Sequence, residues 1–181
     1  MDRALKKKLI INILIGAIIT AILGTLAHFA YEWSGNNRLI GLITAVNEST
    51  WEHMKLLFFP MLLVSIILVL RLKEDYPCIL PALLAGNLVG TFLIPVLFYT
   101  YSGILGKNIS VIDISIYYIC VIAAFYTAYR LTLKDCSEEC TNLLLLITFV
   151  MILLFFIFTY YPPEIGIFDN PERKLKSGRG L

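Results

Sequence analysis

The residues best suited to chemistry lie in the stretch VNESTWEHMKLLFFP, residues 46–60, at the start of a long apolar run. Ionisable side chains at the mouth of a membrane helix are costly unless they are paired, solvated or used. Two histidines with a carboxylate can bind zinc or another divalent metal, and a water on such a metal becomes a nucleophile near neutral pH. The ionisable residues of the stretch are Glu48, Glu52, His53 and Lys55.

Ordinary structural roles explain part of this stretch. Ser49 and Glu52 have the spacing of a capping box, in which Ser49 caps a helix and Glu52 bonds back to the Ser49 amide. Trp51 suits an anchor at the membrane interface, and Lys55 could neutralise Glu52 on the same helical face. These roles leave three residues without an explanation: Asn47, Glu48 and His53.

The composition places the chain in a bilayer. Of the 181 residues, 59% are hydrophobic and only 15% are charged, whereas a soluble domain carries about 25% charged residues. The mean hydropathy is +0.80, and the charges are clumped between long apolar stretches. We therefore expect an integral membrane protein whose first partner is the lipid bilayer, with no nucleic-acid partner.

Five apolar stretches are long enough to cross, because about 20 apolar residues span the hydrocarbon core. We predict an all-α membrane protein, a bundle of five transmembrane helices that forms a single integral membrane domain over residues 1–181. A short re-entrant or interfacial segment, residues 39–46, lies in an outer segment at 32–49, and residues 162–181 form a C-terminal segment with an outer lid. The expected helices cover residues of about 9–31, 50–71, 77–101, 109–130 and 141–161.

The distribution of lysine and arginine predicts a multi-pass protein of the cell membrane with a cytoplasmic N-terminus. Five crossings then place the C-terminus outside, although the basic tail at residues 173–179 opposes the rule. The basic residues expected on the cytoplasmic face are Arg3, Lys6, Lys7, Lys8, Arg71, Lys73, Arg130 and Lys134. Those expected outside in the loops and helix mouths are Arg38, Lys55 and Lys107.

The four cysteines predict no disulfide framework. Cys78, Cys136 and Cys140 fall on the expected cytoplasmic face, where thiols stay reduced. Cys120 lies in the middle of a helix and is expected to pack in the core. Cys136 and Cys140 lack the C-x-x-C spacing of a zinc site.

The first helix is expected to aim polar groups at the same outer mouth. Thr20, Gly24, His28 and Glu32 recur every four residues along one helical face. Small and polar residues on a membrane helix normally face partner helices. His28 and Glu32 should therefore point into the bundle, opposite the stretch at residues 46–60.

Three further patterns in the sequence predict features of the helices and of the C-terminal segment. Gly86 and Gly90, with Asn87 and Thr91 beside them, predict close helix packing with an interhelical hydrogen bond. Ser110 and Asp113 repeat the capping-box spacing, which favours a structural role for Asp113. Pro162 ends the last helix, and the segment that follows should fold over the outer mouth. The acids that this lid would bring to the mouth are Glu164 and Asp169.

The strings HFAYEWSG, VNESTWEHMKLLFFP and FTYYPPEIGIFDNP resemble an uncharacterised family of small bacterial integral membrane proteins. The resemblance extends over essentially the whole chain. It implies a membrane bundle with an outer polar mouth, and it implies no reaction and no catalytic residues.

Two functions fit these observations, and whether the protein is an enzyme stays open between them. The first is binding or transport of a small ligand or cation at an outward-facing polar pocket. The second is a metal-dependent membrane hydrolase that acts on a lipid or lipid-linked substrate. A divalent metal such as zinc, a lipid head group and a second copy of the chain are the candidate partners. The predicted ligand-binding residues are His28, Tyr31, Glu32, Asn47, Glu48, Trp51, Glu52, His53, Lys55, Glu164 and Asp169. The predicted metal ligands are His28, Glu48 and His53.

Overall fold

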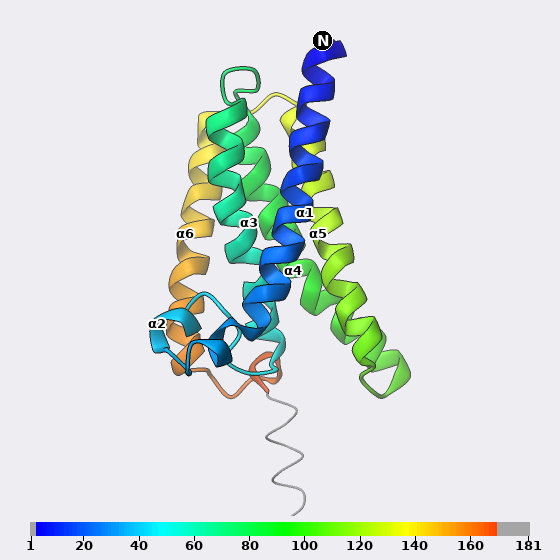
Figure 1. Cartoon of the computed structure of the whole chain (residues 1–181), viewed down its shortest axis with the longest axis vertical. Coiled ribbons are helices and arrows are strands. Elements are labelled where there is room, and N and C mark those ends of the chain that lie inside the picture. The colour runs from blue at the N-terminus through cyan, green and yellow to red at the C-terminus, as the bar shows by residue number, and fades with distance from the viewer. Residues whose placement is uncertain (1–2, 170–181) are drawn as a thin grey trace, which may run out of the picture.

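The computed structural model describes residues 3–169, and five long helices dominate it (Figure 1). Each of the five is long and apolar enough to cross a membrane, which confirms the predicted all-α membrane bundle. No strand occurs among the described residues. The basic tail at 173–179 lies outside them. The long helices are α1 (Arg3–Trp33), α3 (Thr50–Leu72), α4 (Ile79–Leu105), α5 (Ser110–Thr132) and α6 (Glu138–Tyr160).

The segment between α1 and α3, predicted not to cross the membrane, contains no helix long enough to span one. It contains only the four-residue helix α2 (Arg38–Gly41), which Asn37 caps by accepting a hydrogen bond from the Leu39 amide. Figure 1 shows α2 beside the last turns of α1 and α6, at the end of the bundle opposite the N-terminus. The Tyr160 hydroxyl donates to the Arg38 carbonyl at 2.6 Å, so α6 holds the segment against the bundle.

Small residues let α4 approach α5 closely. A Cβ on Gly86 would lie 2.4 Å from the Ala124 carbonyl oxygen, and one on Gly90 would lie 2.6 Å from the Ala124 Cβ. Asn87 is buried and donates to the Phe58 carbonyl at 3.1 Å, which ties α4 to α3. The predicted packing ridge with its interhelical hydrogen bond is confirmed. Cys120 is fully buried in this core, also as expected.

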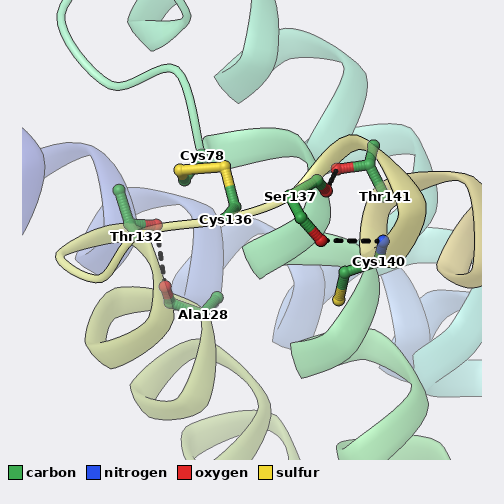
Figure 2. The surroundings of a disulfide bond; sticks show 7 residues. All are labelled: Cys78, Ala128, Thr132, Cys136, Ser137, Cys140 and Thr141. Carbon is green, nitrogen blue, oxygen red and sulfur yellow. Dashed lines mark hydrogen bonds between the residues drawn. A yellow bond between two sulfur atoms is a disulfide. The ribbon is translucent and has the colours of Figure 1, made fainter.

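A disulfide joins the two loops at the N-terminal end of the bundle (Figure 2). Cys78, at the start of α4, is bonded to Cys136 in the loop before α6, and their Cα atoms lie 5.7 Å apart. The expectation that these thiols are reduced was therefore wrong. Disulfides persist mainly in oxidising compartments, whereas the basic residues predict that this end faces the cytoplasm. The two indicators of orientation disagree.

Candidate functional site

Three residues from separate segments meet at the end of the bundle opposite the N-terminus. His28 lies in the second-last turn of α1, Glu48 in the loop before α3, and His53 in the first turn of α3. The Oε2 atom of Glu48 lies 3.4 Å from Nε2 of His53 and 3.9 Å from Nε2 of His28. One potential ligand atom from each residue lies within 4.8 Å of the other two. We call these three residues the triad.

The start of α3 fixes the orientation of the His53 ring. Ser49 caps the helix by accepting a hydrogen bond from the Glu52 amide, and the Ser49 amide donates to the Asn47 side chain at 2.8 Å. The Ser49 carbonyl, turned toward the helix, lies 2.9 Å from Nδ1 of His53. A carbonyl only accepts, so this contact places a proton on Nδ1 and directs Nε2 toward Glu48. A hydrogen bond of this kind on the second ring nitrogen is typical of histidines that bind metals.

The Glu48 carboxyl stays ionised in this environment. Its hydrogen bond with His53 lowers the pKa of the Glu48 carboxyl, partial burial acts against that change, and the charges of His53 and His28 add to it. The side chain remains 44% exposed. Glu48 is thus a carboxylate held in the form that binds cations.

The triad has close to the dimensions of a metal site. Ligand atoms about 2.0–2.2 Å from a tetrahedral zinc lie roughly 3.3–3.6 Å from one another. The 3.4 Å contact between Glu48 and His53 already fits, whereas the 3.9 Å contact to His28 and the overall spread of up to 4.8 Å would have to shorten by rotation of the side chains. Two histidines and one carboxylate form a set found in catalytic zinc sites, which keep a further position open.

A cavity of about 540 Å³ extends from the triad into the bundle. Its floor is formed where α1, α3 and α5 touch at Gly24, since a Cβ there would lie 1.9 Å from the Tyr117 hydroxyl and 2.2 Å from the Leu56 carbonyl. The Tyr117 hydroxyl donates to the Thr20 carbonyl at 3.1 Å. Thr20 and Gly24 face inward as the four-residue periodicity predicted.

Asp113 lines this cavity and does not cap α5 through its side chain, contrary to prediction. The residue before the helix is Ile109, which has no side-chain cap. The Tyr101 hydroxyl donates to the Asp113 carboxylate and accepts from the Ile109 amide. Because α4 supplies this tyrosine, the carboxyl group is turned toward the space between the helices, where it lines the cavity.

Glu52 and Lys55 form a closed ion pair away from the cavity. Their side chains are 2% and 0% exposed, with the carboxylate 2.6 Å from the ammonium. Lys55 also donates to the Gly41 carbonyl at 2.8 Å and to the Thr159 hydroxyl at 2.9 Å. Glu52 accepts from the Val46 amide at 2.9 Å, so its predicted bond to the Ser49 amide was wrong. The structural alternative, in which Lys55 neutralises Glu52, describes this pair, whereas both residues were also predicted to bind ligand in the pocket and neither lines the cavity.

The other predicted ligand-binding residues lie outside the cavity wall. Glu32 is exposed at the end of α1 and does not line the cavity, so its predicted place on the pocket wall was wrong. Tyr31 packs beside Gly41. Trp51 is 7% exposed and contacts the rings of Phe155 and Phe168.

The predicted lid covers a different surface. Its short helix η1 (Gly166–Phe168) packs on Trp51, and the Tyr99 hydroxyl donates to the Gly166 carbonyl at 3.0 Å. Glu164 and Asp169 are exposed, and neither lines the cavity. The expectation that this segment closes the cavity was wrong for its described part, and residues 170 and 171 lie outside the described residues.

Several cavity residues escaped sequence reasoning because no motif marks them. Tyr117 and Tyr118 belong to an apolar helix, and Phe98 and Ile94 resemble any lipid-facing or core residue. The one available signal was Asp113, an acid near the start of a spanning helix. The cavity also has walls formed by Thr25, Thr50 and Asn108.

Comparisons with known proteins give a family and no activity. A family model described as "Family of unknown function (DUF6512)" matches residues 1–175. No curated protein and no solved structure matches the chain. The match confirms the expected membership of an uncharacterised family.

Proposed function

The chain belongs to DUF6512, a family of unknown function, and we propose that it holds a divalent metal ion, zinc or a similar one, at the triad. Nε2 of His28, Nε2 of His53 and the Glu48 carboxylate are the ligands. The observation that carries the proposal is that atoms from three separate segments converge within 4.8 Å. The metal would stand at the mouth of the cavity, where a ligand in the cavity could reach it.

The contact between His53 and Glu48 supports a cation in this place. Nδ1 of His53 donates to Ser49, so in a neutral ring Nε2 carries a lone pair. A lone pair 3.4 Å from a carboxylate oxygen is unfavourable unless a proton or a metal lies between them. A protonated ring would satisfy Glu48 alone. A metal satisfies Glu48, His53 and the His28 nitrogen together. The position of His28 therefore favours a metal over a proton on His53.

A second candidate function is hydrolysis at this metal, which the cavity beside the triad favours. Metal-bound water ionises near neutral pH. His28, Glu48 and His53 would hold the ion, and the ion would supply a water activated for the hydrolysis of an ester to an acid and an alcohol. Asp113 on the cavity wall would serve as a relay for the proton that the water passes to the leaving group.

Transport of a cation across the bundle has less support. In the middle of the molecule α1 contacts α3 and α5 through apolar groups, with Gly16 against Phe125 and Leu68. A Cβ on Gly16 would lie 2.9 Å from the Phe125 ring. This contact favours a site that opens on one face over a pathway from one face to the other.

Metal content of the purified protein tests the proposal. After loading with zinc and dialysis, the wild type should retain about one ion per chain, the number that one three-ligand site holds. The double variant His28→Ala/His53→Ala should retain none. Glu32→Gln is the matched control, since this exposed carboxylate lies one turn from His28 and outside the triad.

Folding of the variants is followed separately by thermal denaturation. If the double alanine variant is unfolded, His28→Gln and His53→Gln replace it, because they keep the side-chain volume. A wild type that binds no zinc, or variants that bind it as well as the wild type, would contradict the metal site.

A further inference from the structure

We propose that the cavity takes the hydrocarbon chain of a single-chain amphiphile from the membrane, with an oxygen-bearing head group at the triad. This inference rests on the metal site proposed above, because the metal would bind the head. It names the class of ligand: a fatty acid, a fatty acyl ester or an amphiphile of the same chemistry.

The walls of the cavity change character with depth. Near the triad they include Asp113, Thr50 and Asn108, which can hydrogen-bond to a head group. Deeper in the bundle they are formed by Leu56, Ile94 and Ile116, each at most 6% exposed. Few polar groups at one end and apolar walls at the other match a ligand with one polar end.

The cavity opens sideways between α1 and α5, at membrane depth. Phe29 of α1 and Ile114 and Tyr118 of α5 line it, yet they are 45%, 59% and 41% exposed on the outer surface of the bundle. Figure 1 shows the outer ends of α5 and α4 diverging from α1 on this side. Exposed apolar groups on a spanning helix face lipid, so a chain could enter from the bilayer without passing through water.

The depth of the cavity suits one end of a hydrocarbon chain. Gly24, at the floor, is nine residues before the end of α1 at Trp33, which corresponds to about 13 Å along the helix. The hydrocarbon core is about 30 Å thick, so the cavity reaches into one half of the bilayer. Below the side opening, the Thr25 and Tyr118 hydroxyls lie 3.2 Å apart and join α1 to α5.

Two tryptophan variants distinguish binding of a chain in the cavity from general contact of the helices with lipid. Ile114→Trp places a large ring at the side opening. Ile119→Trp is the matched control, because Ile119 lies on the same helix, is 51% exposed and does not line the cavity. Neither residue belongs to the triad, so both variants should bind zinc as the wild type does.

The first measurement does not need a metal. Protein in phosphatidylcholine nanodiscs is labelled with a diazirine-bearing fatty acid, and the crosslinked residues are mapped by mass spectrometry. Labelling of α1 and α5 at Phe29 and Tyr118 should saturate and should be displaced by dodecanoic acid. Ile114→Trp should reduce this labelling severalfold, and Ile119→Trp should leave it unchanged.

The second measurement uses the metal. The visible spectrum of cobalt-loaded protein reports ligands that bind the ion, and dodecanoyl hydroxamate is compared with acetohydroxamate. The long chain should act at a concentration at least about tenfold lower, because its methylenes are buried in the cavity. Ile114→Trp should remove this advantage without changing the response to acetohydroxamate, and Ile119→Trp should preserve it.

The outcomes distinguish the two proposals. Saturable labelling without cobalt binding would overturn the metal site and the head-group contact, leaving a chain-binding cavity alone. Cobalt binding with unsaturable labelling and equal action of both hydroxamates would overturn the chain site and leave the metal site. Equal effects of the two tryptophan variants would also overturn the chain site.

Discussion

Glu52 with Lys55 and Glu48 with His53 are two ionisable pairs within eight consecutive residues, and the fold treats them in opposite ways. The first pair is buried, with every proton of the ammonium directed at an acceptor. In the second, the side chains are 44% and 35% exposed and border a cavity. A charge whose partners are all supplied by the protein stabilises the fold. A cluster whose atoms converge on open space can bind something else.

Removing Lys55 should have the largest effect on stability. Lys55→Met leaves the Glu52 carboxylate buried without its counter-ion, which should lower the free energy of unfolding by about 3–5 kcal/mol. Denaturation of the detergent-solubilised protein measures this loss. Glu52→Gln/Lys55→Met, which removes both charges, should regain part of it. The exposed Lys73→Met is the control, and an equal effect of both lysine variants would contradict the assignment of the pair to the fold.

Gly24→Ala should have the next largest effect, because α1 and α3 touch there. The added Cβ would meet the Leu56 carbonyl and the Tyr117 hydroxyl, and such overpacking costs roughly 1–3 kcal/mol. To relieve this overlap α1 would have to move away from α3, and this movement should displace His28 and weaken zinc binding. Gly103→Ala, where nothing lies within 4 Å, should instead raise stability by roughly 0.5–1 kcal/mol. Melting temperatures and zinc titrations of both variants compare them.

Glu48→Gln should separate binding from folding. Because the side chain is half-exposed, its loss of charge should change the free energy of unfolding by less than about 0.5 kcal/mol. Zinc affinity should fall at least about 10–100-fold, the range seen when even a supporting partner of a ligand is lost. Competition with a zinc-chelating dye measures the affinity. A loss of stability as large as that of Lys55→Met would place Glu48 with the structural pair.

The smallest effect on stability is expected from two surface cysteine substitutions. They determine which side of the membrane the triad faces. Asn36→Cys and Asn108→Cys place thiols at the same end as the triad, and the native Cys140 is exposed at the end with the disulfide. A maleimide that cannot cross membranes should modify the two new thiols from one side and Cys140 from the other. The basic residues predict that Asn36 and Asn108 lie outside. Modification of the cysteines introduced at positions 36 and 108 from opposite sides of the membrane would contradict the arrangement of the helices in the bundle.

Sequence reasoning succeeded where a local pattern carries the information. The spacing of Gly86 and Gly90 indicates a helix contact, and His28 and His53 stood out because ionisable residues are rare in apolar helices, with Glu48 just before the second of these helices. It failed where the partner belongs to another helix or to a loop. Asp113 bonds to Tyr101 on another helix, Glu52 turns to the Val46 amide, and Cys78 meets Cys136 across 58 residues. Spacing within one helix carries no information about these partners.

The buried pair also has a consequence for how the chain enters the membrane during synthesis. Chains are made from the N-terminus, so α3 must be inserted before α6 exists. At that stage Lys55 has Glu52 one turn away and the Gly41 carbonyl within the segment already made, while Thr159 is still to be synthesised. The ammonium therefore enters the bilayer with its charge already neutralised by its own helix. The arrival of α6 supplies the last acceptor and locks the outer segment in place, which makes assembly of this corner sequential.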